Sequence, residues 1–216
     1  MRSRFDEQLS QLKRELTEMG AMCEEIIALA AKACTSGDNG LTEKIDPLDT
    51  EIDRMEHDIE SLCLKLLLQQ QPVARDLRQI SAALKMITDM ERIGDQAADI
   101  TELIRFLGGR TTDDCEYISL MAESTIKMVT ESVDAFVNQD LMLAQTAIDH
   151  DDVVDDYFIK IKASLINMIR ENPEDGEYAL DLLMIAKYFE RIGDHAVNIA
   201  EWVVFSVTGT HKGEKI

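Results

Sequence analysis

A five-residue segment, Glu-Arg-Ile-Gly-Asp, occurs twice in this chain, at residues 91–95 and again at residues 190–194. Three further residues recur at the same offset of 99 positions (190 minus 91): Ala97, Ile100 and Glu102 correspond to Ala196, Ile199 and Glu201. A repeat with a fixed period indicates two copies of one structural unit. The repeat constrains the fold more than any other feature, because two similar halves must pack together.

The apolar residues predict that both halves are helical. They recur at steps of three and four residues, the period of an amphipathic helix. Hydrophobic residues make up 45% of the chain but aromatic residues only 5%, a composition that favours helices over strands. Breakers at 36–40, Pro72, 108–109, 138–140 and 172–176 divide the chain. We therefore expect six helices, at about residues 4–34, 41–71, 73–108, 111–137, 140–171 and 177–207.

The predicted fold class is all-α, with two tandem three-helix bundles related by the internal repeat. Each helix of about 30 residues is about 45 Å long, and short loops force neighbouring helices to pack antiparallel. We expect residues 1–108 to form the N-terminal three-helix repeat and residues 109–208 the C-terminal one. Residues 209–216 are expected to form a polar tail.

The charge of the chain excludes several classes of partner. Forty-two acidic against 22 basic residues leave a formal net charge of -20, which repels nucleic acid and anionic lipid. No uncharged apolar run reaches the length of about 18 residues that a membrane span needs, so membrane insertion is not expected. The chain opens without a signal-peptide pattern, and its four cysteines show no Cys-x-x-Cys spacing. We expect a cytoplasmic protein with free thiols.

The repeated segment places acidic residues along one line of a helix. At about 100° per residue, Glu91, Asp95, Asp99 and Glu102 lie within one sector about 80° wide. Their counterparts are Glu190, Asp194, Asn198 and Glu201. Stacked like charges destabilise a helix by a few tenths of a kcal/mol per pair. The earlier turns carry apolar Leu77, Ile80 and Leu84 on this same line, so we expect the buried face of the helix to change near Gly94.

A second acidic pair precedes each copy of the segment. Asp49 and Asp53 lie one turn apart on one predicted helix, as do Asp151 and Asp155 on another. If each of these helices packs against the helix that follows, two carboxylate pairs converge in each half. Oxygen ligands without cysteine favour Mg, Ca, Mn or Fe. The alternative is a metal-free scaffold whose acids pair across helices with arginines: Arg75, Arg78, Arg92 and Arg191.

Other residues refine this hypothesis. Gly94 and Gly193 inside helices each cost about 1 kcal/mol relative to alanine, which predicts close approach of a neighbouring helix. His195 points about 100° away from the acidic line, so a supporting or surface position is favoured over metal ligation. The Glu-x-x-His pair of di-iron bundles is absent, as are nucleotide-binding and nucleophile motifs. We expect no enzyme, and a metal-dependent carboxylate-site enzyme is the alternative.

The duplicated motif resembles the PhoU family of phosphate-transport regulators. The first copy continues Ala97-Ala98-Asp99-Ile100 and the second Val197-Asn198-Ile199-Ala200-Glu201, with Asp-x-x-Ile/Val-Asp on each preceding helix. The resemblance implies a cytoplasmic, non-enzymatic homodimer that binds iron or zinc clusters on Glu/Asp-x-x-x-Asp pairs. It further implies negative regulation of phosphate uptake and phosphate-starvation signalling, through contacts with the ATPase subunit of the phosphate ABC transporter and a membrane-bound sensor histidine kinase. The residues expected to bind metal are Asp49, Asp53, Glu91, Asp95, Asp99, Asp151, Asp155, Glu190, Asp194 and Asn198.

Overall fold

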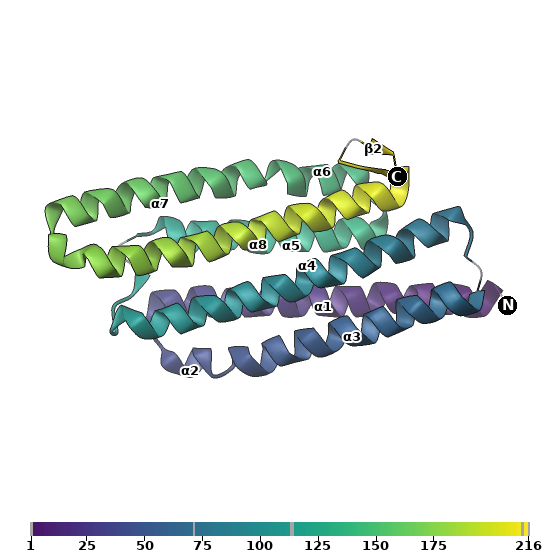
Figure 1. Cartoon of the computed structure of the whole chain (residues 1–216), viewed down its shortest axis with the longest axis horizontal. Helices are drawn as coiled ribbons and strands as arrows, with labels where there is room; N and C mark the ends of the chain where they lie inside the picture. Colours follow the sequence, from purple (N-terminus) through teal and green to yellow (C-terminus); the bar gives the residue numbers. More distant parts are fainter. Residues whose placement is uncertain (1, 71, 113–114, 213, 216) are drawn as a thin grey trace.

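Long antiparallel helices dominate the structure, a computed structural model that describes residues 2–70, 72–112, 115–212 and 214–215 (Figure 1). The elements of the first half are α1 (Arg2–Ser36), α2 (Asn39–Thr42), α3 (Ile45–Gln70), α4 (Ala74–Ile104) and the 3-10 turn η1 (Arg105–Leu107). The second half contains α5 (Tyr117–Asn138), α6 (Leu141–Asp149), α7 (Asp151–Glu171), the 3-10 turn η3 (Pro173–Asp175) and α8 (Gly176–Thr208). Two short strands follow, β1 (Thr210–His211) and β2 (Glu214–Lys215).

Helices α1, α3 and α4 form one three-helix bundle, and α5, the α6–α7 pair and α8 form the other. The bundles lie side by side, with α4 packed along α8 and α1 along α5 (Figure 1). One continuous apolar core runs through both bundles. The predicted fold class, two three-helix bundles related by an internal repeat, is confirmed.

Three predicted helix boundaries differ from the structure. The second predicted helix is divided into α2 and α3, because Pro47 has no N–H to donate to the carbonyl four residues earlier. The long helix predicted over 140–171 is interrupted at His150, and α5 begins at Tyr117 rather than near residue 111. Gly108 and Gly209 end their helices with φ angles of 62° and 77°, a left-handed conformation that favours glycine.

The expectation that α4 changes its buried face near Gly94 is wrong. Met86, Met90, Ile93 and Ala97 are all fully buried and follow one side of the helix through both of its halves. Leu77 is 45% exposed, so the apolar line that precedes the acidic residues belongs to the edge of the buried face. The carboxylates therefore lie beside the core, where neighbouring helices partly cover them.

The end of the chain folds back on α8. Strands β1 and β2 pair antiparallel, with Thr210 opposite Lys215. The His211 ring stacks on Trp202 with 3.9 Å between ring centroids, and Lys212 forms a 3.0 Å ion pair with Glu201. Within the part of the chain that the structure describes, no helix is both long and apolar enough to span a bilayer.

Candidate metal centre

Gly94 lets helices α3 and α4 approach each other closely. A Cβ atom at this buried position would lie 2.9 Å from Asp49 Oδ1 and 3.3 Å from Ile52 Cδ1. Any side chain at residue 94 would therefore push α3 or its carboxylate away. The glycine inside the repeated motif brings the acidic pair of α3 beside the acidic pair of α4.

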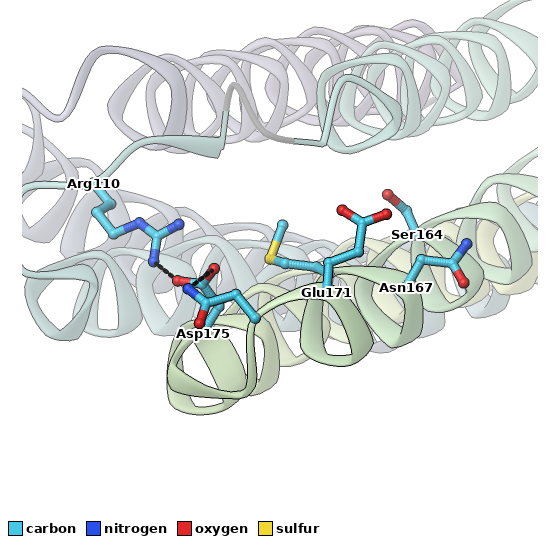
Figure 2. A pocket seen from close by; sticks show the side chains of 7 residues that line it. Arg110, Ser164, Asn167, Glu171 and Asp175 are labelled. Carbon is cyan, nitrogen blue, oxygen red and sulfur yellow. Dashed lines mark hydrogen bonds and ion pairs between the residues drawn. The ribbon is translucent and has the colours of Figure 1, made fainter.

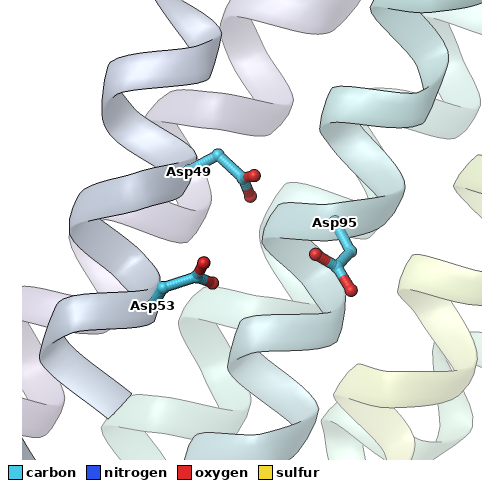
Figure 3. A group of neighbouring side chains, drawn as sticks. All are labelled: Asp49, Asp53 and Asp95. Atoms are coloured by element: carbon cyan, nitrogen blue, oxygen red, sulfur yellow. The ribbon is translucent and has the colours of Figure 1, made fainter. Parts of the chain in front are cut away.

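Three aspartates converge at this contact. Asp49 and Asp53 point from α3 toward α4, which carries Asp95 (Figure 3). Each offers one carboxylate oxygen, and these three oxygens lie within 4.8 Å of one another. Among the described residues, this group alone meets that distance criterion for three or more potential ligands. The structure thus brings together three of the predicted metal-binding residues of the first half.

These carboxylates are poorly compensated. The Oδ1 atoms of Asp49 and Asp53 are buried and have no hydrogen-bond partner among the described residues. Burial, followed by the charges of Asp53 and Asp95, raises the pKa of Asp49 to about 6. Burial and then Asp95 likewise raise the pKa of Glu91. An electrostatic field that favours protonation of carboxylates also favours a bound cation.

Arg92 compensates only the outer side of the cluster. Its guanidinium lies 2.8 Å from Asp95 Oδ2 and 3.3 Å from Glu91 Oε2, and its side chain is 54% exposed. The Glu91 contact is an ion pair without hydrogen-bond geometry, since Oε2 has no hydrogen-bond partner. Within the described residues, Arg92 forms ion pairs on its own helix and none with Asp49 or Asp53 on α3. Arg92 therefore does not make the cross-helix pair that the metal-free alternative assigns to it.

The second half repeats the arrangement in a looser form. Asp151 and Asp155 on α7 face Glu190 and Asp194 on α8. Burial, then Asp155 and Asp194, raise the pKa of Asp151 to about 6, and burial with Glu190 raises that of Asp194. A Cβ at Gly193 would lie 3.6 Å from Asp151 Oδ1, an ordinary contact distance. The second acidic group is therefore less tightly assembled than the first.

A lysine distinguishes the second acidic group further. Lys187 forms an ion pair with Glu190 and also lies 5.4 Å from the centre of the Phe158 ring. The residue 99 positions earlier is Thr88, which is uncharged and donates a hydrogen bond to Glu56 instead. Glu190 is thus partly neutralised by Lys187. The one ion-pair partner of its counterpart Glu91 within the described residues is the exposed Arg92.

Asp99 and Asn198 take part in contacts between the two bundles. Asn198 on α8 donates a 3.2 Å hydrogen bond to Asp89 on α4, and His195 Nδ1 lies 2.9 Å from the same carboxylate oxygen. Asp99 on α4 interacts with the Tyr188 hydroxyl on α8, and burial is the main cause that raises the pKa values of both groups. The two contacts occupy equivalent places in the repeat, because Asp89 corresponds to Tyr188 and Asp99 to Asn198 at the offset of 99.

Sequence reasoning overlooked Asp89, Lys187 and Tyr188. The repeat offset relates two of them, since Asp89 occupies in the first copy the position of Tyr188 in the second. Nothing in the sequence marks Lys187 as a partner of Glu190 apart from their spacing of three residues on one helix.

A separate cavity of about 450 Å³ lies at the turn between α7 and α8 (Figure 2). Arg110 lines this cavity and donates a 2.6 Å hydrogen bond to Asp175. Its guanidinium stacks on the Tyr178 ring, with 3.4 Å between Cζ and the ring centroid. Ser164, Asn167 and Glu171 also line it. None of the predicted metal-binding residues lines this cavity.

The structure belongs to a class of all-helical proteins built from two three-helix bundles. Each bundle carries paired carboxylates between two adjacent helices. The PhoU domain profile matches residues 16–104 and 118–203 of this chain. The chain belongs to the PhoU family, and the resemblance noted in the sequence is confirmed.

Relatives and solved structures agree with this assignment. A phosphate-specific transport system accessory protein PhoU homolog from Clostridium acetobutylicum is 35% identical over 207 residues, covering 95% of this chain and 94% of the relative. The crystal structure of PhoU from Pseudomonas aeruginosa superposes with a TM-score of 0.89 at 32% identity, covering 95% of this chain and all of that one (100%). The phosphate transport system regulatory protein PhoU from Streptococcus pneumoniae has a TM-score of 0.87 at 25% identity, covering 96% and 98%.

Proposed function

We propose that this protein is a cytoplasmic, metal-binding accessory protein of phosphate transport that restrains phosphate uptake and phosphate-starvation signalling. The observation that carries the metal site is the convergence of Asp49, Asp53 and Asp95, whose oxygens lie within 4.8 Å of one another. The accessory role is supported by relatives that are named phosphate-specific transport system accessory proteins.

The residues of the first half fit a cation. Asp49, Asp53, Glu91 and Asp95 supply oxygen donors only, and buried oxygens of three of them lack hydrogen-bond partners within the described chain. Such donors suit iron, zinc held by carboxylates, or the harder cations Mg, Mn and Ca. In the second half, Asp151, Asp155, Glu190 and Asp194 are the corresponding ligands. Asp99 and Asn198 would have to leave their contacts across α4 and α8 to join them.

A bound metal would supply positive charge where the fold concentrates negative charge. The chain carries a formal charge of -20, and neutralisation of its acidic clusters would change which surfaces it can dock onto. We propose that the metal-loaded homodimer contacts the ATPase subunit of a phosphate ABC transporter and a membrane-bound sensor histidine kinase. It acts there by binding rather than by catalysis.

Metal analysis of purified protein tests the site. We expect the wild type, dialysed against Fe or Zn, to retain metal that an Asp49→Asn, Asp95→Asn double variant loses. Glu60→Gln is the matched control, because Glu60 is exposed on α3 and has no ion-pair or hydrogen-bond partner among the described residues. Equal metal content in the wild type and the double variant would contradict the proposal.

Regulation needs a separate measurement. Deletion of the gene should raise phosphate uptake by cells in phosphate-replete medium, and the Glu60→Gln protein should restore the low rate. The Asp49→Asn, Asp95→Asn protein should restore it incompletely if the metal serves regulation. Unchanged uptake after deletion would refute the regulatory role and leave the metal result standing.

A further inference from the structure

Three basic residues, Lys13, Arg75 and Arg78, lie near the end of the molecule where α4 begins and α8 ends. In Figure 1 the starts of α1 and α4 and the end of α8 all lie at the right-hand end of the molecule. Lys13 on α1 reaches the end of α5, where Nζ donates a 2.7 Å hydrogen bond to the Val137 carbonyl. Burial, followed by the charge of nearby Arg75, lowers the pKa of Lys13. Arg78 lies against the C-terminal turn of α8, with Cδ 3.6 Å from a Cβ built at Gly209.

The two arginines of this basic cluster lack partners among the described residues. Within the described residues, Arg75 and Arg78 form no ion pair and no hydrogen bond, and Arg78 Nε is buried without an acceptor. The two arginines lie three positions apart on α4 and are neighbours on the helix surface. Like charges held together without a counter-ion destabilise the fold, and an anion between them would remove that cost.

The start of α4 adds to the positive potential. This helix of 31 residues begins after Val73, whose side chain cannot cap the first N–H groups. Helical geometry places Arg75 and Arg78 about 60° apart around the axis. The acidic residue of this turn, Asp76, lies about 100° from Arg75 and about 160° from Arg78. It therefore points away from the basic cluster.

The cluster is not a consequence of the internal repeat. The residues 99 positions after Arg75 and Arg78 are Glu174 and Glu177. The repeat has thus retained acidic motifs in both halves, while these two positions carry opposite charge in the two halves.

We propose that Lys13, Arg75 and Arg78 form a binding site for a phosphate oxyanion, with free inorganic phosphate as the ligand. A tetrahedral dianion can accept hydrogen bonds from two guanidinium groups, an ammonium group and the first N–H groups of α4 at once. The net charge of -20 favours a small free ion over a lipid headgroup, because an extended anionic surface would meet the repulsion of the whole molecule. The site lies apart from the acidic clusters and does not depend on metal.

Calorimetric titration of inorganic phosphate into chelator-treated protein tests this site, with chloride at matched ionic strength as the reference. The chelator removes bound metal, so that phosphate cannot bind to the protein through a metal ion. The diagnostic variant is Arg75→Gln, since Arg75 is exposed and its loss should leave the fold intact. Lys85→Gln is the matched control, because it removes one positive charge from an exposed position of the same helix.

We expect phosphate to bind the wild type and Lys85→Gln alike, and Arg75→Gln to bind it at least 5-fold more weakly. The double variant Arg75→Gln, Arg78→Gln should show no phosphate binding while its circular dichroism remains helical. No phosphate-specific heat with the wild type, or equal weakening by Lys85→Gln, would overturn the proposal. Binding to phosphatidic acid vesicles without binding of free phosphate would overturn it in favour of a lipid headgroup.

Discussion

Asp49 Oδ1 lies 2.9 Å from the position that a Cβ atom would occupy at Gly94. The corresponding distance between Asp151 Oδ1 and a Cβ at Gly193 is 3.6 Å. The same glycine of the repeated motif is therefore required for close approach in the first half and nearly dispensable in the second. The closer approach in the first half accompanies the convergence of its three aspartate oxygens.

Alanine at the two glycine positions should affect different properties, metal affinity at Gly94 and stability at Gly193. Gly94→Ala places a methyl group against Asp49 and Ile52, so we expect at least a 10-fold loss of metal affinity at the first cluster. Gly193→Ala meets only ordinary contacts, and its helix propensity should stabilise the protein by up to about 1 kcal/mol. Metal titration and urea denaturation measure the two effects. Equal metal affinity of Gly94→Ala and wild type would show that this approach is not needed for the site.

The raised pKa values of Asp49 and Asp151, each about 6, predict a pH-dependent stability of the metal-free protein. Between the ordinary aspartate value of 3.8 and about 6, the folded state binds more protons than the unfolded state. The free energy of unfolding should therefore fall as the pH rises from about 4 to about 7. After allowance for solvent screening, we expect the free energy of unfolding to fall by about 1 kcal/mol per site.

Urea denaturation in chelator at pH 5.0 and pH 7.5 measures this dependence. The Asp49→Asn, Asp151→Asn variant should lose most of the difference between the two pH values, because neither position titrates. A wild-type protein that is more stable at pH 7.5 than at pH 5.0 would contradict the assignment.

Neutralisation of Asp49 alone should separate stability from metal binding. Asp49→Asn removes a half-buried charge that repels Asp53 and Asp95, so the metal-free protein at pH 7 should gain about 1 kcal/mol of stability. The same variant should bind less metal than the wild type. Asp156→Asn, at an exposed position of α7, is the control and should change neither property. A destabilised Asp49→Asn protein would indicate that the carboxylate is structural.

The contact between α4 and α8 should depend on Asp89. Its carboxylate oxygen accepts a hydrogen bond from Asn198 and lies 2.9 Å from His195 Nδ1. Asp89→Ala leaves both groups without this partner, and we expect a loss of about 1–2 kcal/mol in the free energy of unfolding. Thermal denaturation compares it with Asp156→Ala, which removes an exposed carboxylate. Equal stability of the two variants would show that this polar contact contributes nothing between the bundles.

Much of the fold followed from local patterns. The apolar periodicity and the breakers predicted the helices, because these patterns act within a few turns of one helix. The repeat at an offset of 99 then predicted two similar three-helix bundles. One exception has a local cause, because Pro47 divides a predicted helix through its missing N–H. The predicted change of buried face near Gly94 was wrong because projection around one axis does not reveal how widely the neighbouring helices cover it.

The candidate site was predictable only in part. The sequence by itself determined the acidic pairs and their spacing, the two motif glycines and the excess of negative charge. Only the tertiary structure decided that Asp49, Asp53 and Asp95 converge. It also placed Asp99 and Asn198 against the opposite bundle, and Lys13 near Arg75. Helical periodicity specifies the direction of a side chain around its own axis. The distance between carboxylates on different helices depends on how closely and at what rotation those helices pack, which the whole core determines.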